Sequence, residues 1–295
     1  MATLEETVYR PPLENESALL EISLGCSYGR CTFCRYSDGN TPLQLLSPEM
    51  LCENLEELVA QGEQATRMFL LGGNVLAFKS RYLADIFRLV RRYLPGVTQF
   101  SMYARADDVA QKSDEQLEEL RRGGLDTLYI GVESGNAQIL ENCRKGETPE
   151  EIVAALHRLD RVGLSYGLSS ILGLGGREMW RQNALDTAAL YNEVNPISIR
   201  VMTLTPMAGT PLAVEADSGS FRPLTPRQAL EEERLLLEAI SKTHAPCLFV
   251  GTHISNSVPV KGMLPRDRDR MIEALSNAIA GADDKDLAQD GAIEW

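Results

Sequence analysis

The chain has 295 residues, 44% of them apolar and 24% charged, and a net charge of −13 at pH 7. This size and apolar content predict one barrel-type α/β domain or two smaller domains with a real core, and they exclude a disordered chain. The negative charge argues against nucleic acid as a partner, and the longest nearly apolar run, residues 68–78, is too short to span a bilayer. The first residues, MATLEE, lack the basic and apolar regions of an export signal, so we expect a cytoplasmic protein.

Three closely spaced cysteines follow the first strand-like run, residues 19–24. Cys26, Cys31 and Cys34 form the pattern C-x4-C-x2-C. Three thiolates on one tight loop can hold three irons of a cubane iron–sulfur cluster and leave the fourth iron open to a substrate or cosubstrate. A zinc site that lacks its fourth ligand, or three core cysteines, are alternatives that this spacing leaves open. The other cysteines stand singly and are expected to be structural thiols in a reducing cytosol: Cys52, Cys143 and Cys247.

Strand-like runs alternate with helix-like stretches along most of the chain. The strand-like runs are residues 19–24, 68–71, 100–103, 127–132, 166–172 and 197–202. Helix starts are marked by Ser47 before a proline, and by capping boxes that begin at Ser113 and Thr148. Six strands alternating with helices predict parallel pairing with the helices outside. An open doubly wound sheet and a partial barrel both fit this rhythm.

Several polar and glycine residues stand at the predicted strand ends, where a barrel places its active site. These residues are Gly72, Gly73, Tyr103, Arg105, Glu133 and Arg200. Either arginine could bind the carboxylate of a substrate or cosubstrate with two hydrogen bonds, and Tyr103 is a further candidate for substrate contact. The glycine pattern of a dinucleotide-binding fold does not follow the first strand, and the chain has no Walker loop.

The organisation changes after residue 212. We therefore expect a barrel with its N-terminal lead-in over residues 1–212 and a C-terminal extension, packed on the barrel, over residues 213–295. A connection over residues 210–223 leads to a helix from Thr225 to about residue 242, a last helix covers residues 265–280, and an acidic tail begins at about residue 281. In the sequence His-Ile-Ser-Asn, His253 and Asn256 are candidates for touching substrate, with a structural hydrogen bond as the alternative for His253.

The cysteine loop resembles the cluster-binding motif of the radical S-adenosylmethionine (SAM) enzymes, with Phe33 as the aromatic residue before Cys34. It has one residue more than their commonest spacing, C-x3-C-x2-C, and this variant is typical of a branch related to Elp3-like and coproporphyrinogen-dehydrogenase-like enzymes. The resemblance extends in order along most of the chain, through residues 9–12, 25–34, 129–135, 145–146, 173–176, 203–206, 209–212 and 253–265.

The resemblance implies an α/β fold, a partial (β/α)6 TIM-like barrel with a C-terminal helical extension, and two cofactors. A [4Fe–4S] cluster would be bound by Cys26, Cys31 and Cys34, and SAM would chelate its open iron. The backbone at Phe33 would meet the adenine, on which Leu172 would pack.

The resemblance also implies partners for the rest of the SAM molecule. Backbone carbonyls of Gly72 and Gly73 would receive the methionyl amine, whereas Asn74 departs from the acidic residue usual at its position. Glu133 would accept hydrogen bonds from the ribose hydroxyls, and Lys145 would pair with the methionyl carboxylate.

The implied reaction begins with an electron passed from the reduced cluster to SAM. The resulting 5′-deoxyadenosyl radical would abstract hydrogen from a small-molecule substrate in a site that excludes water and oxygen. Flavodoxin or ferredoxin is the kind of electron donor that this chemistry requires. The alternatives are a porphyrinogen oxidative decarboxylase-like enzyme, a non-catalytic haem or iron–sulfur carrier on the same fold, and a plain electron-transfer protein.

Overall fold

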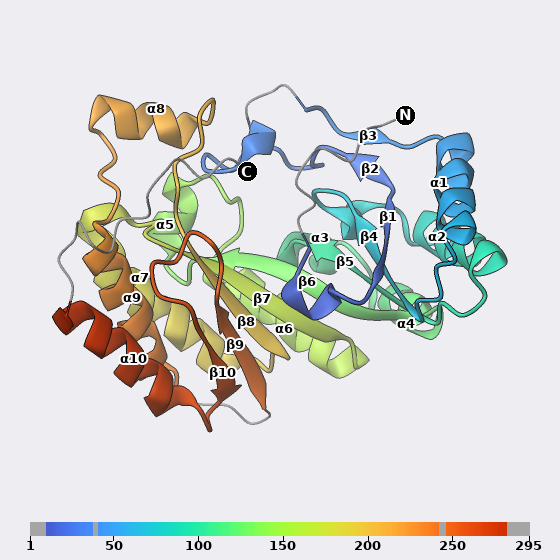
Figure 1. The fold of residues 1–295 in the computed structure, drawn as a ribbon. Helices are drawn as coiled ribbons and strands as arrows, with labels where there is room; N and C mark the ends of the chain where they lie inside the picture. Colours follow the sequence, from blue (N-terminus) through green and yellow to red (C-terminus); the bar gives the residue numbers. More distant parts are fainter. Residues whose placement is uncertain (1–9, 38–40, 242–245, 282–295) are drawn as a thin grey trace.

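One eight-stranded sheet organises the computed structural model, which describes residues 10–37, 41–241 and 246–281 (Figure 1). Its strands lie in the order β1-β4-β5-β6-β7-β8-β9-β10. The first six pair in parallel, which confirms the six predicted strands: β1 (Ala18–Glu21), β4 (Arg67–Leu71), β5 (Gln99–Ala104), β6 (Leu125–Glu133), β7 (Ser165–Leu172) and β8 (Ser198–Thr203).

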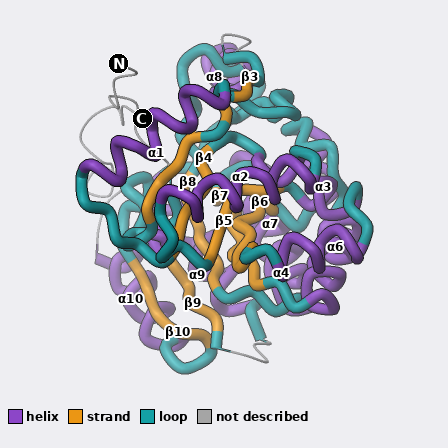
Figure 2. The backbone as a smooth tube through the Cα atoms, turned by 90° about the vertical axis from the view of Figure 1, so that its right-hand side faces the viewer, coloured by secondary structure: helices purple, strands orange, loops and turns teal. Residues whose placement is uncertain are grey.

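The order of the strands in space follows their order in the chain. A doubly wound sheet instead reverses its order at a switch point, so the arrangement is that of a barrel. Within the described residues no pairing joins β10 to β1, and the barrel is therefore partial. The predicted α/β partial barrel is confirmed, and Figure 2 shows its strands side by side with helices around them.

The helices begin where the sequence places their caps. Ser47 accepts a hydrogen bond from the Met50 amide, and capping boxes begin at Ser113 and Thr148. The helices are α1 (Pro48–Ala60), α2 (Ser80–Tyr93), α3 (Ala106–Ala110), α4 (Asp114–Arg122), α5 (Ala137–Asn142), α6 (Pro149–Val162), α7 (Gly176–Glu193), α8 (Pro211–Ser218), α9 (Pro226–Ala239) and α10 (Arg268–Gly281). Within the described residues, no helix combines the length and apolarity needed to cross a bilayer.

The C-terminal third adds two strands to the sheet. Strand β9 (Cys247–Gly251) pairs in parallel with β8, and β10 (Val260–Leu264) pairs antiparallel with β9, so this region extends the sheet as well as packing on it. The expected connection over residues 210–223 contains α8, which Thr210 caps through the Ala213 amide. The acidic tail expected from about residue 281 lies almost entirely outside the described residues.

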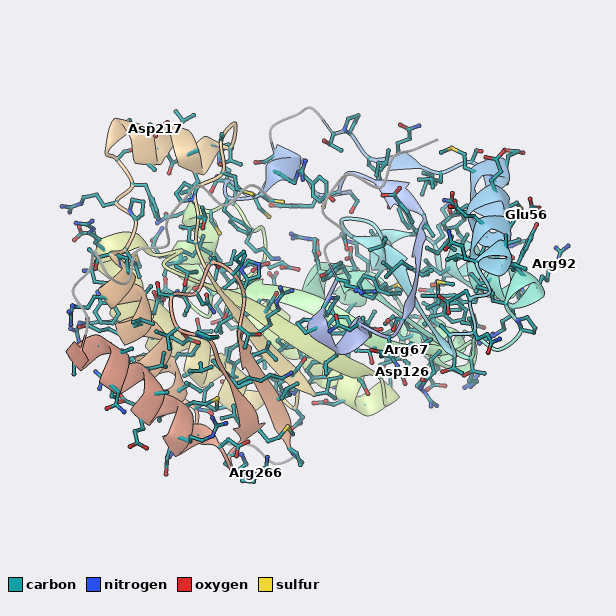
Figure 3. The ribbon with its side chains drawn as sticks, in the orientation of Figure 1. Glu56, Arg67, Arg92, Asp126, Asp217 and Arg266 are labelled. Carbon is teal, nitrogen blue, oxygen red and sulfur yellow. The ribbon has the colours of Figure 1, made fainter. Side chains whose placement is uncertain are left out.

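A buried carboxylate holds the N-terminal lead-in against the end of the barrel where the parallel strands begin. Glu14, at the end of the short helical turn η1 (Pro12–Glu14), is 0% exposed and accepts hydrogen bonds from Arg67 at 2.9 Å and from the Tyr129 hydroxyl at 2.7 Å. Arg67 also contacts Asp126 at 2.6 Å, and Figure 3 shows these two side chains together, where β4 and β6 begin. Burial raises the pKa of Glu14, but its hydrogen bonds from Arg67, Ser17 and Tyr129 outweigh burial and lower the pKa below its ordinary value.

Candidate active site

The three closely spaced cysteines lie on a tight loop after strand β2 (Ser23–Leu24), near the C-terminal ends of the barrel strands (Figure 1). The Cys34 amide donates to the Cys31 carbonyl at 3.0 Å, which folds the loop back on itself. Gly25 has φ +69, and a Cβ there would lie 2.6 Å from the carbonyl oxygens of Thr41 and Pro42. The loop therefore needs glycine at this position.

The three thiols form one electrostatic group and no disulfide. Burial raises the pKa of Cys34 to about 12, and the neighbouring thiols of Cys31 and Cys26 raise it as well. Three such thiols ionise together only if a cation stands between them. Within the described residues no three His, Cys, Asp or Glu side chains are placed to hold a single metal ion. A cubane cluster does not need three side chains that converge on one ion, because each thiolate binds its own iron. The donor set of three thiols therefore fits such a cluster.

The Cys143 thiol, expected to be merely structural, lies close to the cysteine loop. The backbone carbonyl of Cys143 accepts a hydrogen bond from the Thr32 amide at 2.9 Å, and the thiol donates to the Leu140 carbonyl at 3.5 Å. The residue is 3% exposed. Cys31 contributes to raising its pKa, although burial is the larger cause. Cys143 thus holds the loop against the end of α5.

The spacing of Glu133 and Lys145 brings their side chains together, with the ammonium 3.3 Å from the carboxylate. Lys145 is only 4% exposed, so this pair is not a surface contact. Glu133 has φ +64 and follows a break in the β6–β7 register, and a bulge of this kind re-aims a side chain. A Cβ at Gly131 would lie 2.0 Å from the Glu133 carboxylate, so glycine makes room for the pair.

The carboxylates of Glu133 and Glu147 keep the Lys145 side chain charged. Burial lowers the pKa of Lys145, but Glu133 and Glu147 outweigh it, and the pKa lies above its ordinary value. Glu147, 3.7 Å from the ammonium, is a residue that sequence reasoning missed. Its carboxylate also accepts a hydrogen bond from the Asp107 amide at 2.8 Å, which joins the start of α3 to this group.

Arg105 supports the segment that carries Lys145 and lines neither of the two cavities inside the barrel. Its guanidinium donates to Asp107 at 2.9 Å and to the Lys145 carbonyl at 2.8 Å. The Tyr28 ring covers it, with 3.8 Å from the guanidinium carbon to the ring centre. Sequence reasoning missed Tyr28, although it stands between two of the loop cysteines.

The Asn74 side chain is buried beside the cysteine loop with a fixed orientation. Its amide nitrogen donates to the Ser27 hydroxyl at 2.9 Å and to the Asp108 carboxylate at 3.2 Å. Its amide oxygen is buried without a hydrogen-bond partner among the described residues. A buried acceptor of this kind is costly unless a donor fills the position. The position fits a cationic amine.

A cavity of about 400 Å³ lies beneath the cysteine loop and inside the barrel. Its wall includes the candidate site residues Phe33, Cys34, Gly72, Gly73 and Tyr103, and also Ile171 and Met202. Leu172 lies instead among the buried core residues, with 2% exposure. Glu133 and Lys145 are beside the cysteine loop and do not form part of this wall.

A smaller cavity of about 180 Å³ lies deeper in the barrel, toward the N-terminal lead-in. Arg200 is part of its wall, and Tyr103, Met202 and His253 belong to the walls of both cavities. The cavities therefore adjoin.

His253 and Asn256 are both in the loop that follows β9. Asn256 accepts from the Thr203 amide at 2.8 Å and donates to the Val201 carbonyl at 3.1 Å, so it ties this loop to β8. The Ser255 amide donates to His253 Nδ1 at 3.2 Å, which leaves the ring proton of the neutral form on Nε2. Burial, with a contribution from Arg200, lowers the pKa of His253 to about 4.

Known proteins resemble this chain in sequence and in structure. The family model described as the Radical SAM superfamily matches residues 20–188. The 4′-phospho-dehydrooxetanocin synthase of Priestia megaterium is 28% identical over 172 residues, which are 52% of this chain and 23% of that protein. Biotin synthase 2 of Paracoccus denitrificans is 23% identical over 288 residues, 92% of this chain and 87% of that protein. The crystal structure of methylornithine synthase is 18% identical with a TM-score of 0.54, and the match covers 92% of this chain and 84% of that one.

Proposed function

The chain belongs to the radical SAM superfamily, whose members are enzymes that use a [4Fe–4S] cluster and SAM, and we propose that it cleaves SAM reductively to act on a small molecule. When bound, the two cofactors supply a 5′-deoxyadenosyl radical that abstracts hydrogen. Cys26, Cys31 and Cys34 hold the cluster in this proposal. Its support is the grouping of three mutually interacting thiols on one tight loop above a cavity.

The buried pair of Lys145 and Glu133 is the observation that carries the SAM site. Lys145 and Glu133 both interact electrostatically with Cys31, so a ligand on the cluster would meet both charges. Lys145 binds the methionyl carboxylate through a charge-assisted hydrogen bond, and Glu133 accepts from the ribose hydroxyls. The contact of 3.3 Å uses one of the three donors of the ammonium and one of the two carboxylate oxygens, so each side chain can bind its SAM group while the pair is kept.

Asn74 provides an acceptor for the methionyl amine. Its amide oxygen has no partner among the described residues, while Ser27 and Asp108 hold its amide nitrogen. The fixed orientation directs the oxygen, and not the nitrogen, to a cationic donor. An amide at this position thus serves where an acidic residue is usual, with the nearby Asp108 carboxylate as its support.

The barrel interior receives the substrate. The cavity of about 400 Å³ is bounded by Cys34 and Phe33 at the loop and by Tyr103, Met202 and His253 within the barrel. A small molecule there would lie close to the cluster and away from bulk water. Flavodoxin or ferredoxin would supply electrons from outside.

Equilibrium binding and turnover together test this function. The anaerobically reconstituted protein should bind SAM, and under dithionite it should form 5′-deoxyadenosine. A haem or iron–sulfur carrier and a plain electron-transfer protein would form none. Absence of both SAM binding and 5′-deoxyadenosine from a fully loaded cluster protein would reject the proposal.

A further inference from the structure

The smaller cavity contains a charged side chain that no carboxylate neutralises. We propose that Arg200 binds a carboxylate of the substrate, so that the enzyme acts on carboxylic acids. This inference rests on the proposed function, because it assigns a substrate class to the same barrel interior. Arg200 is on β8, where alternate residues face opposite sides, and Ser198, Arg200 and Met202 all line the cavity.

Arg200 differs from the other inward or buried cations of the described chain. Arg67 pairs with Glu14, Arg105 with Asp107, and Lys145 with Glu133. Lys112, which is also buried, has no ion pair among the described residues but donates to the Phe78 carbonyl at 2.9 Å. For Arg200 the described residues show no ion pair and no hydrogen bond; its electrostatic neighbours are Tyr103 and His253. A cation in a low-dielectric site without an anion is unfavourable, and a ligand anion would remove that cost.

The neighbours of Arg200 are neutral donors and not competing anions. Burial raises the pKa of Tyr103 to about 12 even though Arg200 lowers it, so the hydroxyl keeps its proton. This hydroxyl has no hydrogen-bond partner among the described residues. His253 is neutral at pH 7, with its proton on Nε2. Among the described residues that line the smaller cavity, Arg200 is the only one charged at this pH.

The shape of the interior orients such a substrate. The smaller cavity adjoins the larger one at Tyr103, Met202 and His253, and the larger one reaches Cys34. A molecule with its carboxylate on Arg200 therefore extends its other end toward the cofactor side, where hydrogen is abstracted. One planar guanidinium matches a carboxylate with two hydrogen bonds. A phosphate monoester brings nearly two charges to a single cation, so we commit to the carboxylate.

The methionyl carboxylate of SAM is a different anion with its own cations. Lys145 and Arg105 interact electrostatically with Cys31, whereas Arg200 faces the deeper cavity. Loss of Arg200 should therefore leave SAM affinity unchanged. This separation makes the two proposals independently testable.

The test uses the full, reconstituted chain and three sets of probes: straight-chain monocarboxylates, the primary amides of the same carbon chains, and the matching alkyl phosphate monoesters. Binding is measured by ligand-observed NMR in the presence of SAM. A carboxylate should bind wild type at least about tenfold more tightly than its amide, the factor expected for one charge-assisted contact. Arg200→Met should abolish this preference and Arg200→Lys should retain part of it. The control Arg121→Met, at an exposed position on α4, should change nothing.

Several outcomes would overturn the inference. They are equal binding of carboxylate and amide to wild type, no binding of any carboxylate, tighter binding of the phosphate monoesters, or an unchanged preference in Arg200→Met. If Arg200→Met does not fold, the comparison of carboxylate binding with amide binding to wild type still tests the inference. A tenfold loss of SAM affinity in Arg200→Met would assign Arg200 to the cosubstrate and would likewise overturn the inference. Failure of wild type to bind SAM would reject the proposed function, while a carboxylate preference lost in Arg200→Met would still establish the anion site.

Discussion

The Arg105 guanidinium lies against the Tyr28 ring, 3.8 Å from its centre. The Tyr28 hydroxyl also donates to the Arg144 carbonyl at 2.8 Å, and Arg105 donates to the Lys145 carbonyl at 2.8 Å. These contacts join the cysteine loop to the segment that carries Lys145. The proposed cluster ligands and the proposed SAM cation are thus positioned by one connected group.

Replacement of Tyr28 tests this connection. Tyr28→Phe removes one hydrogen bond and keeps the ring, so it should lower the free energy of unfolding by about 1 kcal/mol. Tyr28→Leu also removes the cation–π contact, worth about 0.5–2 kcal/mol, and should cost more and release iron faster from reconstituted protein. Thermal unfolding and iron loss to a chelator are the measurements. Equal behaviour of Tyr28→Leu and wild type in both would contradict the account.

Lys145→Met removes the buried cation while keeping much of the side-chain length. SAM affinity of the reconstituted, oxidised protein should fall about tenfold or more, because a charge-assisted contact is worth about 1.5–3 kcal/mol. Glu133→Gln should weaken SAM binding too, since it replaces an ionised acceptor by an amide. Lys79→Met, at an exposed lysine before α2, is the matched control and should bind SAM as wild type does.

Isothermal titration of SAM into each folded variant gives these affinities. If both Lys145→Met and Glu133→Gln bind SAM as tightly as wild type, the ion pair is structural and the assignment of the SAM site fails.

Gly131→Ala probes the space that the ion pair occupies. The added Cβ would lie 2.0 Å from the Glu133 carboxylate and 3.3 Å from the Lys145 ammonium, so the carboxylate must move. We expect weaker SAM binding with the cluster retained. Gly96→Ala is the control, because its nearest new neighbour would be the Ala65 carbonyl oxygen at 3.8 Å. Unchanged SAM affinity in Gly131→Ala would show that the position of the pair does not matter.

Glu233, on α9 and far in sequence from the cysteine loop, predicts a pH dependence of stability. It is 1% exposed, and burial raises its pKa from 4.5 to about 8. The folded state therefore binds more protons than the unfolded state between these values, and stability falls as pH rises from about 4.5 to 8.

Glu233→Gln should remove this contribution. The variant should gain stability over wild type by an amount that grows between pH 5 and pH 8, on the order of 1 kcal/mol or more. Urea unfolding at several pH values provides the free energies. A wild-type-minus-variant difference that is constant with pH would show that Glu233 does not titrate in this range.

Local signals in the sequence predicted much of this architecture. Helix starts at Ser47, Ser113 and Thr148 follow from side chain to backbone contacts within one turn, and the cysteine loop follows from its spacing. The cap at Thr210 is equally local and was overlooked. Strand β10 was missed because Lys261 and Gly262 weaken its apolar pattern, and its pairing with β9 stabilises it in the fold.

The roles of individual site residues depended on contacts that spacing does not encode. Arg105 was predicted to bind a carboxylate ligand, but its partners Tyr28 and Asp107 come from the loop and from α3. Leu172 and Ile171 are neighbours on β7 with opposite faces, so a choice between them depends on register. Membership of the radical SAM superfamily is confirmed, whereas the narrower branch and the ligand roles stay predictions.

Iron binding by single-cysteine variants tests the central claim most directly. Wild type reconstituted without oxygen should hold about four irons and four sulfides per chain, by the stoichiometry of a cubane cluster. Cys26→Ala, Cys31→Ala and Cys34→Ala should each lose the cluster. Cys52→Ala and Cys247→Ala should keep it, and they are better controls than Cys143→Ala because Cys143 packs beside the loop. A full complement of iron in any of the three loop variants, or its loss in Cys52→Ala or Cys247→Ala, would contradict the assignment of Cys26, Cys31 and Cys34 as the cluster ligands.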